Sequence, residues 1–169
     1  MKYVFVDPSG SYTEGKGHTG IATIIDDKWD TLTTKSLAAK DYTERHLYWN
    51  AILKEILNAS RTSKTGCTVI IESFQIRANG FLIGKMPETI LCIGALIWEL
   101  EQYNIDYVFQ SPTQAKSRFK DDKLPRYIPG LERRENGRYY LNGKMINDHI
   151  RDALKHLLYF ERYGKEKIK

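Results

Sequence analysis

The sequence predicts an α/β fold, a mixed sheet of five strands (three antiparallel, then parallel strands) with helices on both faces. Three observations predict it. The first 36 residues contain three short segments rich in β-branched and aromatic residues, separated by turn signals. Helical spacing of apolar residues then alternates with two further short apolar runs. The resulting order of three strands, a helix, a strand, a helix, a strand and two helices is typical of a sheet covered by helices.

The N-terminal strands are expected at residues 2–6, 21–25 and 31–36. The first strand ends at Asp7-Pro8-Ser9-Gly10, which is a strong turn signal, and a glycine-rich loop leads to the second strand. Asp26-Asp27 turns the chain into the third strand. We therefore expect an antiparallel meander in which Asp7 lies at the C-terminal end of the first strand.

A helix and a fourth strand are expected next. Apolar residues recur at helical spacing over residues 42–59, where Thr43 is a plausible cap. The apolar run 68–71 then predicts a strand that stops at Glu72. Ligand sites in such folds gather at the C-terminal ends of strands. Asp7 and Glu72 are therefore candidate site residues.

The remaining elements are three helices and one strand. Pro87 opens an apolar helix that runs to Tyr103, because a proline at the first helical position lacks only an N–H that has no partner there. Residues 105–110 predict a strand, and Ser111-Pro112 begin a short helix. The last helix starts at Asn147 or Asp148, with a core stripe formed by Ile150, Ala153, Leu154, Leu157 and Leu158. Its adjoining face carries His149, Asp152 and His156.

A single domain covering residues 1–169 is expected from the length and from a globular composition of 41% hydrophobic and 28% charged residues. Residues 119–145 are basic and turn-rich, which predicts an excursion over the surface outside the core, with a hairpin around residues 138–143. No apolar stretch is long enough to cross a membrane, and the N-terminal apolar run is too short for a signal peptide. We therefore expect a cytoplasmic protein without membrane contact.

The spacing of the two cysteines, Cys67 and Cys92, fits neither a zinc site nor a disulfide framework. Each lies in an apolar segment, so both are predicted to be small core residues in a reducing compartment.

Positive charge is concentrated in the final third of the chain. Residues 111–169 carry fifteen Lys or Arg against eight Asp or Glu, whereas residues 1–110 carry eleven against thirteen. Such a basic region suggests a polyanionic partner, because phosphate neutralisation supplies most of the non-specific affinity for nucleic acids. A solvated lysine-rich tail, such as the terminal KEKIK, explains the charge equally well.

Asp7, Glu72 and Asp152, with His149 as a fourth candidate, form a potential site for divalent metal ions. Phosphodiester hydrolysis needs a nucleophile at neutral pH and charge compensation for the leaving oxygen, and two cations can provide both. Hard cations such as Mg²⁺ prefer oxygen ligands from a few carboxylates. Each acid alone has another explanation. Asp7 could stabilise a turn, Glu72 could be a solvated strand end, and Asp152 could be an exposed first-turn acid that the helix dipole favours. Taken together, the three acids favour a metal site.

Four motifs resemble those of the RuvC-type Holliday junction resolvases, especially their phage-encoded branch, in the ribonuclease H-like superfamily. VFVDPSG followed by TGIA resembles the first two strands of that family, and VIIESFQIRAN resembles its strand-glutamate segment. SPTQAKS is similar to its Pro-x-Gln-x-Lys helix, and HIRDALKHLLYF to its closing acidic helix. The resemblance covers most of the chain in order. It implies a homodimer that nicks four-way DNA junctions symmetrically, using two Mg²⁺ or Mn²⁺ ions per active site and no small-molecule cofactor.

The resemblance also implies roles for individual residues. The metal ligands would be Asp7, Glu72, His149 and Asp152, with Asp148 as an alternative to His149. Lys116 matches a family lysine near the scissile phosphate, where an ammonium could stabilise developing charge; the alternative is an exposed helix lysine. The expected DNA contacts are Phe74, Arg77, Asn79, Lys116, Arg118 and Lys120.

Two of these assignments have alternatives. Phe74 could wedge into the opened junction or pack in the core. The 119–145 segment could carry Arg133, Arg134 and Arg138 onto DNA, or be a solvated insertion. The dimer surface is expected along the apolar helix near residues 91–98.

Three functions remain open from the sequence. The first is a junction resolvase, and the second is another nuclease of the same fold that acts on RNA–DNA hybrids or flaps or in DNA packaging. The third is a non-catalytic DNA-binding module, against which the joint presence of Asp7, Glu72 and Asp152 argues.

Overall fold

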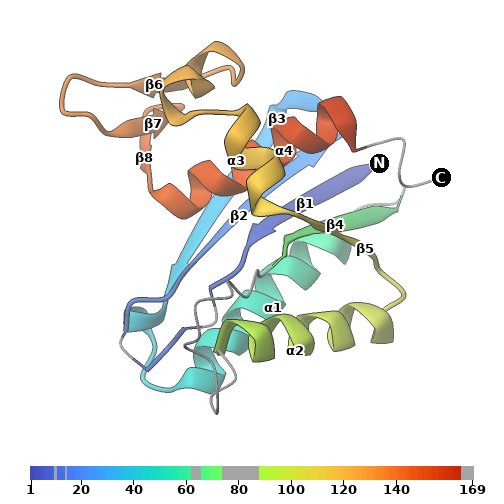
Figure 1. Cartoon of the computed structure of the whole chain (residues 1–169). Helices are drawn as coiled ribbons and strands as arrows, with labels where there is room; N and C mark the ends of the chain where they lie inside the picture. The colour runs from blue at the N-terminus through green and yellow to red at the C-terminus, as the bar shows by residue number, and fades with distance from the viewer. Residues whose placement is uncertain (10, 14, 62–65, 74–87, 165–169) are drawn as a thin grey trace.

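The central element of the structure is a five-stranded mixed sheet (Figure 1). The structure is a computed structural model that describes residues 1–9, 11–13, 15–61, 66–73 and 88–164. The strands lie in the order β3-β2-β1-β4-β5. β1, β2 and β3 are antiparallel, and β4 and β5 run parallel to β1. Their bounds are β1 (Lys2–Asp7), β2 (His18–Ile25), β3 (Lys28–Ala38), β4 (Cys67–Glu72) and β5 (Asp106–Gln110). The predicted fold class is confirmed.

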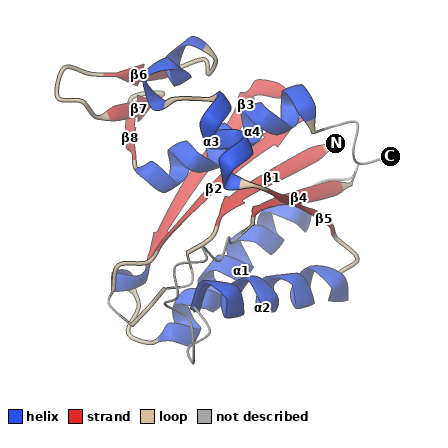
Figure 2. Ribbon diagram, viewed as in Figure 1, coloured by secondary structure: helices blue, strands red, loops and turns tan. Residues whose placement is uncertain are grey.

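Helices cover both faces of the sheet (Figure 2). α1 (Arg45–Arg61) and α2 (Glu88–Gln102) lie on one face, and α3 (Pro112–Arg118) and α4 (Asp148–Tyr163) lie on the other. The central strand β1 supplies both interfaces, because successive side chains of a strand point to opposite faces. Tyr3 and Phe5 pack with α4, whereas Val4 and Val6 pack with α1 and α2. No helix in these described ranges is long and apolar enough to cross a membrane.

The meander strands are longer than expected. β2 begins at His18 and β3 extends from Lys28 to Ala38, because the two strands pair along almost their whole length. Asp26 and Asp27 join them with φ angles of 49° and 58°, as a two-residue hairpin turn requires. The exposed positions of β3 are polar, so its length is not visible as an apolar run.

The N-terminal end of the first helix also differs from expectation. α1 begins at Arg45 rather than residue 42, after a short 3-10 helix, η1 (Ala39–Asp41). The amide of Tyr48 bonds to the carbonyl of Glu44, so Thr43 is not the cap. The described part of α2 begins at Glu88, and Pro87 lies outside the described residues.

The segment between α3 and α4 forms a second, smaller sheet. It contains the 3-10 helix η2 (Asp121–Arg126) and the antiparallel strands β6 (Leu131–Arg133), β7 (Tyr139–Leu141) and β8 (Lys144–Ile146). β7 and β8 form the predicted hairpin around Asn142-Gly143, whose φ angles are positive. The many turn residues of this segment connect these short strands.

The expectation that this segment lies outside the core is wrong. Seven of its apolar side chains are buried in the same cluster as α4, namely Phe119, Leu124, Ile128, Leu131, Tyr139, Leu141 and Ile146. They stand singly between turn residues and therefore show no periodic pattern. The basic residues Arg133, Arg134 and Arg138 are exposed, as expected for a basic surface.

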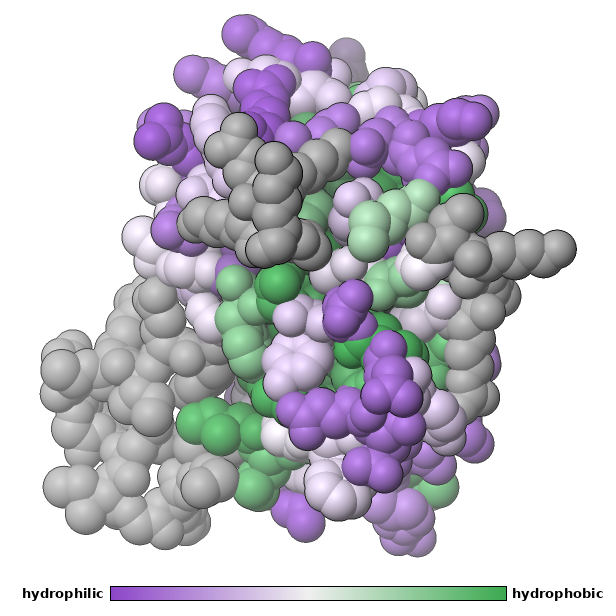
Figure 3. Space-filling view, turned by 90° about the vertical axis from the view of Figure 1, so that its right-hand side faces the viewer, coloured by the Kyte–Doolittle hydropathy of each residue, from purple (hydrophilic) through white to green (hydrophobic). Residues whose placement is uncertain are grey.

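One side of the molecule has hydrophobic side chains at its surface. Figure 3 shows the side of the molecule on which β5 and the N-terminal end of β1 lie in Figure 1. Hydrophilic side chains dominate its upper edge, and hydrophobic side chains reach the surface in its middle. Phe109, on the edge strand β5, is 49% exposed.

The two cysteines are free. Cys92 is buried and Cys67 is half-buried, both beside the α1 and α2 face of the sheet. Burial raises the pKa of the Cys92 thiol to about 12. Both cysteines are therefore packing residues, as predicted.

Gly20 lets α4 rest directly on the backbone of the sheet. A Cβ atom added to this β2 residue would lie 2.2 Å from the carbonyl oxygen of His149 and 2.7 Å from the amide nitrogen of Ile150. Backbone atoms cannot rotate away, so a larger residue would displace the helix. Gly20 is the register partner of Asp7 in β1. The close approach thus brings the first turn of α4 beside Asp7.

We expect Gly20→Ala to lower the free energy of unfolding by about 1–3 kcal/mol, because the added methyl group overpacks a rigid contact. Urea denaturation followed by circular dichroism measures the change. Gly94→Ala in α2 is the matched control, since a Cβ there meets none of the described residues within 4 Å. It should be neutral or stabilising by up to about 1 kcal/mol. Equal effects of the two substitutions would contradict the proposed contact.

Candidate metal centre

Three carboxylates meet at one edge of the sheet. β1 and β4 are parallel neighbours with Val6 opposite Ile71, so Asp7 and Glu72 end adjacent strands. α4 crosses this edge and adds Asp152. One oxygen from each acid lies within 4.8 Å of the others. The structure therefore brings together the three acids that the sequence separates by 65 and 80 positions.

His149 contacts this cluster through Asp7. Its Nδ1 lies 2.8 Å from Oδ2 of Asp7, and its ring stacks on that of His18 with centroids 5.7 Å apart. The hydrogen bond to Asp7 raises the pKa of His149, against the effect of burial. Asp148 lies outside the cluster, with a side chain that is 82% exposed and paired with Arg151 at 2.9 Å. Of the two alternatives, His149 is the one beside the acids.

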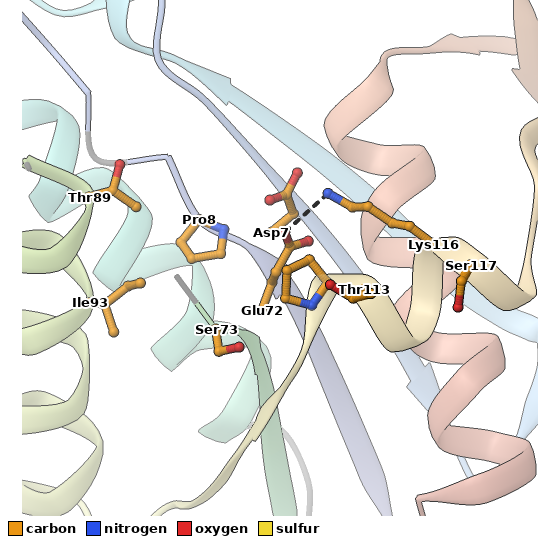
Figure 4. Close-up of a pocket in the computed structure, with 10 residues that line it drawn as sticks. Asp7, Pro8, Glu72, Ser73, Thr89, Ile93, Thr113, Lys116 and Ser117 are labelled. Atoms are coloured by element: carbon orange, nitrogen blue, oxygen red, sulfur yellow. Dashed lines mark hydrogen bonds and ion pairs between the residues drawn. The ribbon is translucent and has the colours of Figure 1, made fainter. Parts of the chain in front are cut away.

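Lys116 places a positive charge between two of the acids, and Figure 4 shows its contact with one of them, Glu72. Its Nζ lies 3.1 Å from Oε1 of Glu72 and 2.8 Å from Oδ2 of Asp152. Burial opposes protonation, but Asp152 and Glu72 outweigh it and raise the pKa of Lys116 well above its usual range. The short helix α3 holds the lysine, with Pro112 at its start and Ala115 buried. The alternative of a freely exposed helix lysine is therefore wrong.

The three acids have different electrostatic surroundings. Burial raises the pKa of Asp7, and the neighbouring charge of Glu72 adds to this increase. Burial also opposes the ionisation of Glu72 and Asp152. Hydrogen bonds from basic partners outweigh it and lower the pKa of both, from His156 and Lys116 for Glu72 and from Lys116 and Lys155 for Asp152. Asp7 thus lies beside the ionised Glu72 and Asp152. This concentration of acidic groups favours the binding of a cation in addition to the basic side chains.

The donor set fits a hard divalent cation. Its ligand atoms are carboxylate oxygens from three separate elements, with an imidazole at its margin. Oxygen-rich sites of this kind suit Mg²⁺ and Mn²⁺. The metal site predicted from the sequence is thus compatible with the geometry of Asp7, Glu72 and Asp152.

A cavity of about 450 Å³ opens in front of the acids, between α2 and α3. Figure 4 shows Asp7 and Glu72 facing the ammonium of Lys116, with Thr89 and Ile93 of α2 on the opposite side. The described residues that line it are Asp7, Pro8, Glu72, Ser73, Thr89, Ile93, Pro112, Thr113, Lys116 and Ser117. An extended ligand can therefore reach the carboxylates from solvent.

Two partners of the acids were not among the predicted site residues. The buried His156 places Nε2 at 2.8 Å from Oε2 of Glu72. Lys155 lies 2.7 Å from Asp152 and 2.6 Å from Asp121 of η2. The shared helix face of residues 149, 152 and 156 was a signal for His156. No sequence pattern pointed to Lys155.

The predicted nucleic-acid contacts have different positions. Phe74, Arg77 and Asn79 lie outside the described residues. Arg118 is exposed, and its guanidinium lies 5.7 Å from the ring centroid of Tyr163. Lys120 is exposed at the start of η2. Their contact with DNA stays a prediction.

Comparison with known proteins gave similarity of structure alone. No protein-family model matches the chain, and no curated protein matches it. RuvC of T. thermophilus in complex with a Holliday junction substrate superposes with a TM-score of 0.62 and 18% identity, over 99% of this chain and 96% of that chain. A second Thermus thermophilus RuvC structure gives a TM-score of 0.57 and 18% identity, with 97% of each chain covered. The predicted RuvC-like, ribonuclease H-like fold is confirmed, and the phage branch stays a prediction.

We expect Lys116→Met to lower the free energy of unfolding at pH 7 by about 1–2 kcal/mol, because Glu72 and Asp152 would face each other without the ammonium. The value is below that of a fully buried pair, since the Lys116 side chain is 37% exposed. Both carboxyls have a lowered pKa when folded. The stabilisation is therefore present above their ordinary values of 4.5 and 3.8 and is lost as the pH falls through the folded values.

Thermal unfolding of wild type and variant over a pH series measures this difference, which should vanish near about pH 2. Lys144→Met, at an exposed position of β8, is the matched control and should behave like wild type throughout. A difference of the same size in strongly acidic solution would show that Lys116 stabilises by packing alone.

Proposed function

We propose that this chain is a divalent-metal-dependent endonuclease that resolves four-way DNA junctions by symmetrical nicking. The convergence of Asp7, Glu72 and Asp152 within 4.8 Å carries the proposal. The end-to-end likeness to a RuvC that was determined with a Holliday junction substrate supports junction DNA as the substrate. Under this proposal the acids bind metal, and the open cavity before them admits the DNA backbone.

Asp7, Glu72 and Asp152 would hold two Mg²⁺ or Mn²⁺ ions, with His149 as a fourth donor beside Asp7. When bound, such ions supply a nucleophile at neutral pH and compensate the charge of the leaving oxygen. Lys116 shares its ammonium between Glu72 and Asp152, 3.1 and 2.8 Å away. An ammonium at this place can also bind the scissile phosphate and stabilise its developing charge.

Basic side chains beyond the cavity would bind the DNA backbone. Arg118 and Lys120 follow Lys116 along the chain, and both are exposed. We include Phe74, Arg77 and Asn79 in the proposed contact set on the basis of the motif that contains Glu72. The exposed arginines of the small sheet (Arg133, Arg134 and Arg138) extend the basic surface. Phosphate contacts of this kind give affinity without sequence preference.

A homodimer would provide the two sites that symmetrical nicking requires. Leu91 and Trp98 of α2 are 42% and 63% exposed, and exposed Gly94 lies on the same helix face between them. None of the described residues lies within 4 Å of a Cβ added at Gly94, so this face of α2 is open to a second copy and has room for a methyl group there. We propose that two copies of the chain pair through this apolar face of α2.

We expect Trp98→Glu to convert the dimer into a monomer, because it places a charge at the centre of the proposed interface. Sedimentation equilibrium of the wild type and the variant measures the association. Met145→Glu, on the small sheet, is a matched control because Met145 is a similarly exposed apolar side chain, at 59%. This control should remain dimeric. A wild-type monomer at high concentration would contradict the homodimer, and a dimeric Trp98→Glu variant would place its interface elsewhere.

Asp7→Asn and Glu72→Gln should each reduce cleavage by at least about a thousandfold, since loss of a metal ligand removes several kcal/mol of transition-state stabilisation. Fold and junction affinity should change little, because each amide has the shape of the acid and keeps an oxygen that can accept from the basic partners. Single-turnover cleavage, junction binding and circular dichroism measure the three properties. Asp30→Asn, an exposed β3 carboxylate, is the control with unchanged cleavage. Joint loss of folding and binding would contradict a metal-binding role.

The substrate is tested with four-way junction, duplex, flap and RNA–DNA hybrid molecules, each with and without Mg²⁺ or Mn²⁺. The proposal predicts paired symmetrical nicks, confined to the junction and dependent on the metal. Preferred cleavage of hybrid or flap would identify another nuclease of the same fold. Junction binding without cleavage under any metal would identify a DNA-binding module.

A further inference from the structure

His156 is a buried histidine whose polar contact is with an acid of the candidate metal centre. It lies one turn after Asp152 on α4, and its side chain is fully buried. Nε2 is 2.8 Å from Oε2 of Glu72, a residue 84 positions earlier in the chain. Nδ1 is buried and has no hydrogen-bond partner among the residues that the structure describes. Among the described residues, the imidazole therefore makes its polar contact with Glu72.

The direction of this hydrogen bond follows from the chemistry of the two groups. Oε1 of Glu72 lies 3.1 Å from the ammonium of Lys116, a cation that pairs with the ionised carboxylate. An ionised carboxylate can only accept hydrogen bonds. Nε2 of His156 therefore carries the hydrogen and donates the hydrogen bond to Oε2.

The fold alone gives no reason for a histidine at this position. The neighbouring residues Leu154, Leu157 and Leu158 are buried and apolar. A ring nitrogen that is buried without a partner is unfavourable, and a leucine of the same stripe would avoid it. The hydrogen bond to Glu72 offsets the cost of burying the unpaired ring nitrogen of the histidine.

The two oxygens of Glu72 face different partners. Oε1 accepts from Lys116, whose Nζ also meets Asp152, so this oxygen faces the acidic cluster. Oε2 faces α4 and His156. The terminal torsion of a glutamate is broad, and one anchored oxygen is sufficient to restrict it. With Oε2 held, Oε1 stays directed at the cluster even when Lys116 moves to another anion.

The other two acids have basic partners on the same helix. Asp7 is held by His149 at 2.8 Å, and Asp152 by Lys155 at 2.7 Å. His149 is 36% exposed and Lys155 is 9% exposed, whereas His156 is completely enclosed. The enclosed ring cannot rotate to solvent, which makes it the most restrictive of the three partners.

We propose that His156 is a positioning residue, which holds Oε2 of Glu72 and thereby keeps Oε1 directed at the site of metal binding. This inference rests on the proposed function for the presence of the metal. It concerns Glu72 alone, so it can also be measured without metal. Groups that orient metal ligands in this way typically change metal affinity by about 10–100-fold when they are replaced.

The test compares three substitutions. His156→Gln keeps an N–H donor near the place of Nε2, whereas His156→Asn is a polar amide too short to reach Glu72. His156→Leu removes the donor entirely. His46→Asn is the matched control, because the side chain of His46 is 70% exposed on α1.

The first readout is the pH titration of the Glu72 carboxyl carbon by ¹³C NMR without metal, with the signal assigned from Glu72→Gln. We expect the midpoint to rise in His156→Asn and His156→Leu and to stay near the wild-type value in His156→Gln. The second readout is the Mn²⁺ dissociation constant from calorimetry, which should increase about 10–100-fold in the first two variants and by only a few-fold in His156→Gln.

An unchanged titration midpoint and an unchanged Mn²⁺ constant in folded His156→Asn would overturn the inference. If His156→Leu does not fold, the comparison of the two amides decides, since they differ by one methylene. A wild type that binds no Mn²⁺ contradicts the proposed function, while a raised Glu72 midpoint in His156→Asn still supports the positioning role. The two failures are therefore distinguishable.

Discussion

The direct contact between the backbone of α4 and the backbone of β2 at Gly20 is the constraint on which the candidate site depends. Strand ends alone bring together Asp7 and Glu72, because β1 and β4 are parallel neighbours. The third acid comes from a helix, and a helix at ordinary packing distance would hold it farther from the sheet. At Gly20 the side chain is absent, so the first turn of α4 reaches the level of Asp7.

Gathering three acids in a half-buried place has an electrostatic cost that the surrounding residues offset. Lys116 lies between Glu72 and Asp152, and each acid has a further basic partner on α4. These partners stabilise the ionised cluster without closing the cavity in front of it. The cluster can therefore be stable without metal and still be accessible to cations and to a polyanion.

Much of the fold was predictable because its signals are local. Strand runs, turn residues and helical spacing predicted the order of elements along the chain, the mixed sheet, the strand ends at Asp7 and Glu72, and the helix face of Asp152. The core contribution of residues 119–141 was not predictable, because apolar residues such as Leu124 and Ile128 stand alone among turns. The roles of Gly20 and Lys155 depend on contacts with distant backbone or with Asp121, for which a sequence has no periodic signal.

The link from η2 to the candidate site limits how this protein could be re-engineered. Asp121 contacts Lys155, and Lys155 contacts Asp152, so the segment before the small sheet belongs to the electrostatic support of an acid. Leu131, Tyr139 and Leu141 also cover the apolar side of α4. A chimera in which residues 119–146 were replaced by a segment without these apolar side chains and without Asp121 would therefore expose that helix and leave Lys155 with one anion fewer. This segment cannot be exchanged without regard to its contacts with α4.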